Sequence, residues 1–80
     1  MSARKRVSPA ERLRAAMDRC AVARGEAQWT NGYRAAKEPM LSQAEADRLY
    51  AKEQAQWKEV ERVQNAFRRL ALRVLREAGR

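Results

Sequence analysis

The chain has 80 residues, of which 45% are hydrophobic and 35% are charged, and its formal net charge is +8. A chain of this length forms one small domain and buries only about 60% of its unfolded surface, so its stability as a monomer is expected to be marginal. It has one cysteine, Cys20, and no histidine, which excludes an internal disulfide and a structural Cys/His zinc site.

Residues 1–7 form a short basic arm that contains Arg4, Lys5 and Arg6 and has no periodicity. We expect this arm to be flexible. It is not followed by the hydrophobic region of a signal peptide, and no apolar run approaches the roughly 18 residues of a membrane span. These features predict a cytoplasmic protein without membrane contacts.

A first helix is predicted over about residues 8–37. Ser8-Pro9-Ala10-Glu11 is a capping box with proline at the first helical position, where its missing amide N–H does no harm. Asn31-Gly32 is a candidate break, because this dipeptide is a common turn former. Residues spaced three and four apart predict the buried seam of this helix, and they are Leu13, Met17, Cys20, Arg24 and Ala27.

A second helix is predicted over about residues 42–78. Pro39 ends the preceding helical segment, and the second capping box, Ser42-Gln43-Ala44-Glu45, starts the new helix. We expect Gly79 to end it in a left-handed conformation. The predicted buried seam of this helix consists of Val60, Val63, Phe67, Leu70 and Val74.

Two helices with matching seams predict an all-α antiparallel hairpin, which forms a single domain over residues 8–80. If the chain folds back near Met40, facing residues have numbers that sum to about 80. Leu13 then lies opposite Phe67, and Trp29 lies beside Tyr50. The aromatic side chains are interpreted as core packing at the turn end rather than as a platform for nucleobases; they are Trp29, Tyr33, Tyr50 and Trp57.

The second helix has an apolar shoulder that the hairpin cannot cover. Ala71, Leu72 and Leu75 lie about 40° to 140° around the helix from Phe67. This shoulder predicts a homodimer that forms a four-helix bundle, with Leu72 and Leu75 near the new interface. The alternative is that the shoulder binds a different protein.

The charge is uneven along the chain. Residues 1–24 carry seven basic and two acidic groups, residues 62–80 carry six and one, and residues 25–61 carry five and seven. Antiparallel folding brings the two basic segments to the open end of the hairpin. The residues expected to contact phosphates are Arg4, Lys5, Arg6, Arg12, Arg69, Arg73, Arg76 and Arg80. The alternative is a solvated charged face with pairs such as Glu77 with Arg73.

Catalysis is not expected. Without histidine or a glycine-rich phosphate loop, and with Cys20 on a predicted buried seam, no usual nucleophile and base can be assembled. Glu53, the one carboxylate on the seam, is interpreted as a solvated residue or one that sets the register of a dimer. No cofactor, metal or small-molecule substrate is predicted.

The sequence therefore predicts a small basic accessory or regulatory protein that binds DNA or RNA through the phosphate backbone, with weak sequence specificity. The alternative is a stand-alone adaptor or inhibitor, of the kind that phages and mobile elements encode. Such a protein would cover an acidic surface of a larger protein or nucleoprotein complex.

Overall fold

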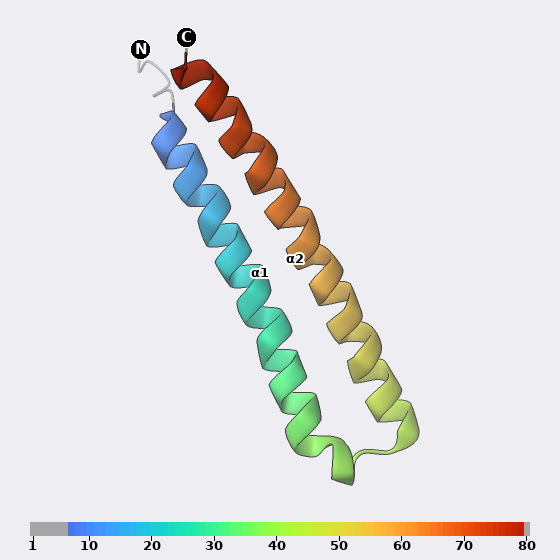
Figure 1. Cartoon of the computed structure of the whole chain (residues 1–80). Helices are drawn as coiled ribbons and strands as arrows, with labels where there is room; N and C mark the ends of the chain where they lie inside the picture. Colours follow the sequence, from blue (N-terminus) through green and yellow to red (C-terminus); the bar gives the residue numbers. More distant parts are fainter. Residues whose placement is uncertain (1–6, 80) are drawn as a thin grey trace, which may run out of the picture.

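The computed structural model of the chain describes residues 7–79. It consists of α1 (Pro9–Lys37), a 3-10 turn (Glu38–Met40) and α2 (Gln43–Ala78). The two helices lie side by side and run antiparallel, so the start of α1 and the end of α2 lie at the same, open end (Figure 1). The predicted all-α hairpin and the extents of its helices are confirmed.

Both helices begin at the predicted serine caps. The Ser8 hydroxyl accepts a hydrogen bond from the Glu11 backbone N–H at 3.1 Å, and the Ser42 hydroxyl accepts one from the Glu45 N–H at 3.2 Å. The predicted left-handed stop at Gly79 is wrong, because its φ is −79°. Its N–H donates to the Leu75 carbonyl at 3.0 Å, so the backbone keeps a helical turn to the end of the described chain.

The candidate break at Asn31-Gly32 does not form, because α1 runs through it without interruption. Thr30 is buried, and its hydroxyl donates to the Glu26 carbonyl one turn earlier at 3.1 Å. The Asn31 side chain donates to Glu53 on α2. These contacts hold in the helix a segment whose local preference is for a turn.

The core of the hairpin consists of small residues on α1 and valines on α2. Ala23 and Ala27 pack against Val60 and Val63, and Trp57 covers this cluster from the side. Burial of each valine contributes about 1.5 kcal/mol or more, and burial of each alanine contributes less. The predicted seam of α2 is confirmed near its centre, and its half-buried remainder lies toward the open end: Phe67, Leu70 and Val74.

The predicted seam of α1 is wrong at two positions. Met17 keeps 58% of its surface exposed and Arg24 is also exposed, whereas Ala16 and Ala23 are buried in their place. Each buried alanine lies one residue before the predicted position. The shift occurs because small residues let the two backbones approach closely, while the longer side chains project along the edge of the interface.

The register between the helices also differs from the prediction. Glu53 was expected opposite Ala27, but it is hydrogen-bonded to Asn31 and Arg34, one to two helical turns further along α1. Apolar residues spaced three and four apart on one helix can pack against the same spacing on the other helix, and they do so equally well after one helix slides along the other by a whole turn. The polar partners of Glu53 therefore select among registers that the apolar spacing leaves equivalent.

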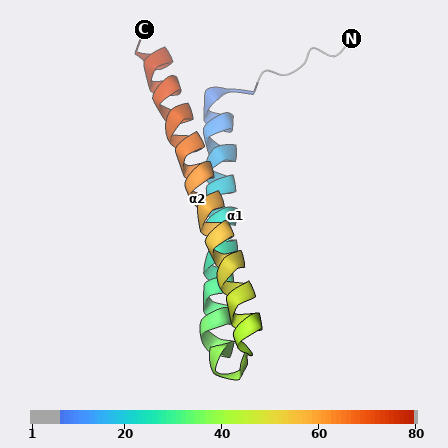
Figure 2. The same ribbon diagram turned by 90° about the vertical axis from the view of Figure 1, so that its right-hand side faces the viewer.

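The hairpin is thin and exposes much of its surface. In the perpendicular view the helices cross at a shallow angle and separate toward the open end (Figure 2). Two helices in one layer thus leave both sides of the hairpin and the backs of both helices open to solvent.

Candidate functional site

The predicted phosphate-binding residues that the structure describes lie at the open end. Arg12 stands in the first turn of α1, and the others stand in the last three turns of α2: Arg69, Arg73 and Arg76. All four are exposed, and none forms an ion pair with a carboxylate among residues 7–79. Arg4, Lys5, Arg6 and Arg80 lie outside the described residues.

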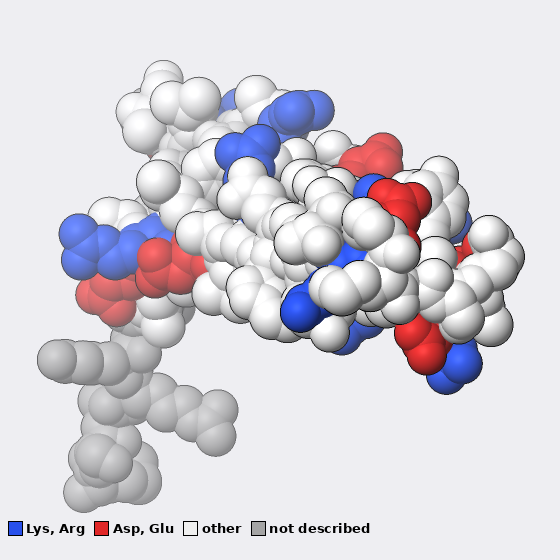
Figure 3. Space-filling model, turned by 90° about the horizontal axis from the view of Figure 1, so that it is seen from below, with Lys and Arg blue, Asp and Glu red and all other residues white. Residues whose placement is uncertain are grey.

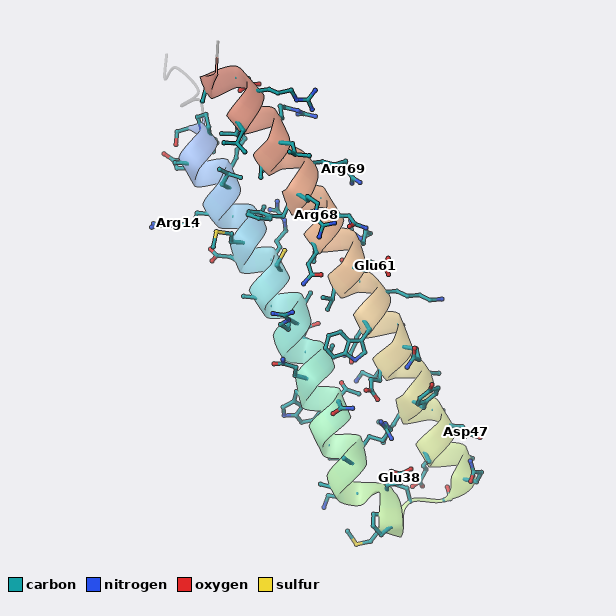
Figure 4. All side chains as sticks on the ribbon, in the orientation of Figure 1. Arg14, Glu38, Asp47, Glu61, Arg68 and Arg69 are labelled. Atoms are coloured by element: carbon teal, nitrogen blue, oxygen red, sulfur yellow. The ribbon has the colours of Figure 1, made fainter. Side chains whose placement is uncertain are left out.

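Helical geometry divides these four arginines between two directions. At about 100° per residue, Arg12 and Arg73 face the same side of the hairpin. Arg69 and Arg76, seven residues apart, point away from α1. Figure 4 shows Arg69 extending outward from α2, and Arg14 extending outward from the opposite edge, on α1. The open end therefore presents positive charge in several directions rather than in one pocket.

The charge asymmetry remains when only described residues are counted. Residues 7–24 carry four basic and two acidic groups, residues 62–79 carry five and one, and residues 25–61 carry five and seven. Seen from the turn end, acidic and basic side chains are interspersed on a largely uncharged surface (Figure 3). The expected pair of Glu77 with Arg73 is not formed in the described chain. The open end thus carries most of the positive charge.

The predicted partner surface is largely exposed. Leu72 keeps 53% and Leu75 keeps 67% of its surface accessible, while Ala71 is half-buried. On the same side of the hairpin a shallow groove of about 340 Å³ runs between the helices; its lining includes Met17, Ala21 and Phe67. We call these six residues the apolar side. Three of them, Met17, Ala21 and Phe67, are not in the predicted partner surface; the sequence places Met17 and Phe67 on the buried seams.

The aromatic side chains do not form the predicted core at the turn end. Trp29 is 66% exposed, and Tyr33 and Tyr50 are exposed as well. Trp29 stacks on Tyr33, with ring centroids 5.3 Å apart and an interplanar angle of 12°, rather than on Tyr50. Only Trp57 packs against the core. The helical face explains the difference, because Trp29 lies about 200° around α1 from the buried Ala27 and therefore points away from α2.

A buried polar cluster joins the helices between the core and the turn. Glu53 is only 5% exposed. Its carboxylate accepts from the Asn31 side-chain amide at 2.7 Å and from Arg34 Nε at 2.8 Å. The hydrogen bonds from Arg34 and then Asn31 lower the pKa of Glu53 below its ordinary value, against the effect of burial. Sequence reasoning found Glu53 on the seam but missed both partners.

Arg34 is the centre of this cluster. Besides Glu53, it approaches the Glu38 carboxylate at 3.6 Å, and its guanidinium carbon lies 5.8 Å from the centroid of the Tyr50 ring. The carboxylate of Glu53 raises the pKa of Arg34, so this arginine remains charged. A carboxylate held by a permanent cation is a weak base, and the cluster therefore has a structural rather than a chemical character.

Cys20 is half-buried beside the core rather than fully buried as predicted. Among residues 7–79, no three acidic or cysteine side chains gather where a metal ion could bind. Neither described helix combines the length and apolarity needed to cross a membrane. Comparisons with protein-family models, curated proteins and solved structures give no match.

Proposed function

We propose that this protein is a small, non-enzymatic nucleic-acid-binding protein that contacts the phosphate backbone with the arginines of its open end. The observation that carries the proposal is the folding-back of the chain, which places two strongly basic helix ends side by side (Figure 1). Arg12, Arg69, Arg73 and Arg76 are exposed there without carboxylate partners in the described chain. Such a distribution favours polyanions over small anions.

The arrangement of these arginines supports backbone contacts rather than reading of base edges. They diverge in direction, and apart from Asn65, four residues before Arg69, their stripe of α2 carries no asparagine or glutamine within residues 62–79. We therefore expect weak sequence specificity. A homodimer joined through the apolar side would present two such ends, which would increase the apparent affinity for a long nucleic acid. The setting we propose is the cytoplasm.

The test is a binding isotherm at several salt concentrations with a random duplex. Four phosphate contacts predict a roughly hundredfold loss of affinity between about 50 and 200 mM salt. Replacing Arg69 and Arg73 together by alanine should lower the slope of log K against log salt by about two. The control is Lys58→Ala, which removes an exposed cation from the acidic segment. Affinity that barely changes with salt would remove the proposal.

A second candidate function follows from the exposed apolar side. Leu72 and Leu75 lie on the same side of the hairpin as the groove at Met17, and a different protein could cover this side. In that case the protein is an adaptor or inhibitor, and the arginines around the apolar surface would contact an acidic partner. The effect of charged substitutions at Leu72 and Leu75 on molar mass separates the two functions, as argued below.

A further inference from the structure

An exposed aromatic pair on α1 lies outside the buried core of the hairpin. Trp29 keeps 66% and Tyr33 keeps 41% of its surface accessible, and neither belongs to the buried cluster. Their rings stack in parallel on the outer part of α1. A large apolar side chain left in solvent contributes little to folding, so the pair calls for another explanation.

The neighbours of Trp29 along the helix leave its ring uncovered. The residues four before and three after it are Gly25 and Gly32. A Cβ added at either glycine would meet no atom within 4 Å, and neither glycine has a positive φ. Glycine in a helix interior is destabilising relative to alanine, and neither packing nor backbone conformation requires it here. With Tyr33 on one side of the indole and Gly25 on the other, one ring face is open to a planar ligand.

Basic residues flank this aromatic pair. Arg12, Arg19 and Tyr33 are separated by multiples of seven residues and so share one face of α1. Arg19 lies about 15 Å along the helix from Trp29. On the other side of the pair, Tyr33 lines a groove of about 340 Å³ between the helices together with Arg48 and one acidic residue, Glu45. A chain of phosphates passing the ring pair would therefore meet a cation before it and a cation after it.

We propose that Trp29 and Tyr33 form a stacking site for an unpaired base of a single-stranded nucleic acid, with Arg19 and Arg48 contacting the phosphates on either side. The inference rests on the proposed function and specifies its substrate class. An aromatic ring stacks on any exposed base, but the bases of a duplex are already stacked on one another. The proposal therefore predicts that the protein prefers single strands to duplexes.

Glu26 lies between Arg19 and Tyr33 on the same face and is exposed. Its carboxylate repels a phosphate at this level, so the strand is expected to turn a base rather than its backbone toward α1 here. Removing this charge relieves the repulsion without altering the rings. Glu26→Gln is therefore expected to strengthen single-strand binding severalfold.

The experiment measures fluorescence anisotropy with labelled oligo-dT and oligo-U of about 15 nucleotides, and with a duplex of the same length. The wild-type protein is expected to bind at least one single strand more tightly than the duplex. Replacing both Trp29 and Tyr33 by alanine should weaken single-strand binding about tenfold or more while changing duplex binding less than about twofold. Comparison of the two oligonucleotides distinguishes DNA from RNA.

Three variants separate stacking from general effects. Gly25→Leu should cover the open ring face and weaken single-strand binding while keeping the helix intact. Trp29→Phe keeps a ring and should retain most of the affinity. Val22→Ala removes an exposed apolar side chain from the same region and should have no effect. Circular dichroism reports the fold of each variant.

Three results would overturn the stacking site. The double alanine variant could lose equal affinity for single strand and duplex, it could lose no affinity, or the wild-type protein could prefer the duplex. A change of molar mass in the double alanine variant would overturn it too, because it would show that the rings bind protein. In all these cases salt-dependent duplex binding would leave the proposed function standing. Binding to none of the three probes at low salt would remove both.

Discussion

At the scale of single residues, the hairpin depends on one buried carboxylate. Glu53 lies where an apolar residue would continue the seam, yet it is satisfied by two side chains from the facing helix. A buried ion pair adds little net stability compared with apolar packing, but removing one partner leaves an unpaired charge. Its main effect here is to specify how α2 aligns with α1.

The first prediction concerns the pH dependence of this residue. The pKa of Glu53 is lowered in the folded state from its ordinary value of 4.5. Its stabilising contribution is therefore complete above about pH 5, and it is lost as the pH falls through the folded-state pKa. Glu53→Gln should unfold several degrees lower at neutral pH and lose less stability on acidification, as measured by thermal melts from neutral to acidic pH.

The matched control is Glu59→Gln. The pKa of Glu59 is also lowered, chiefly by its hydrogen bonds to Arg62, but this pair lies in solvent, where such pairs contribute little. The control should therefore retain the pH dependence of the wild type. If Glu53→Gln follows the same acid profile as the wild type, ionisation of Glu53 does not contribute to the pH dependence of stability.

A second prediction at this scale concerns Gly32. Alanine fits there, since a Cβ would meet no atom within 4 Å and the backbone is helical. Gly32→Ala should raise the free energy of unfolding by about 0.5–1 kcal/mol, because it lowers the entropy of the unfolded chain. Urea titration measures the change. Gly79→Ala, at the frayed end of α2, is the control and should change stability much less; a destabilised Gly32→Ala would show that the segment is not helical in solution.

At the scale of the helices, the sequence predicts what local chemistry determines. The serine caps, the break at Pro39 and the valines of α2 are read correctly because each depends on residues within a few positions. The buried seam of α1 is predicted wrongly at two positions, because alanine is only weakly hydrophobic whereas Met17 is strongly hydrophobic and was therefore placed in the core. The candidate sites follow the same pattern. Leu72 and Leu75 are correctly predicted as exposed, whereas the exposure of Trp29 is missed because pairing by residue number ignores that Trp29 lies about 200° around α1 from Ala27.

The third prediction tests the corrected seam of α1. Ala23 keeps only 9% of its surface exposed and packs against the valines of α2, so a larger side chain there must push the helices apart. Ala23→Leu should lower the free energy of unfolding by about 1–3 kcal/mol. Met17→Leu, at an exposed position of the originally predicted seam, should change it by less than about 0.5 kcal/mol. Urea unfolding of the two variants measures both values, and a reversed order would restore the predicted seam.

At the scale of the whole molecule, the hairpin has too little core for its length. The buried apolar side chains are alanines and valines, whereas several large ones remain exposed, including Met17, Leu72 and Leu75. A two-helix layer encloses no interior, so burial of a second face is the available source of further stability. The apolar side supplies that face, and a second copy of the chain is the partner we propose for it.

The fourth prediction tests that association. In the proposed four-helix bundle Leu72 and Leu75 lie in the interface between copies, so replacing both by glutamate would bury four charges per dimer. Such a dimer is disfavoured by several kcal/mol. Sedimentation equilibrium should therefore show a dimer for the wild type and a monomer for the double variant, whose melting temperature should no longer rise with protein concentration.

The same variant decides between the two candidate functions. A nucleic-acid-binding dimer that becomes a monomer loses one of its two basic ends, so its affinity for a long duplex should fall while its affinity for a short one changes little. Leu72→Ala with Leu75→Ala is a milder pair that adds no charge and should weaken the dimer to a smaller degree. A wild-type protein that is already monomeric, and whose double glutamate variant binds nucleic acid unchanged, would contradict the dimer and assign the apolar side to a different protein partner.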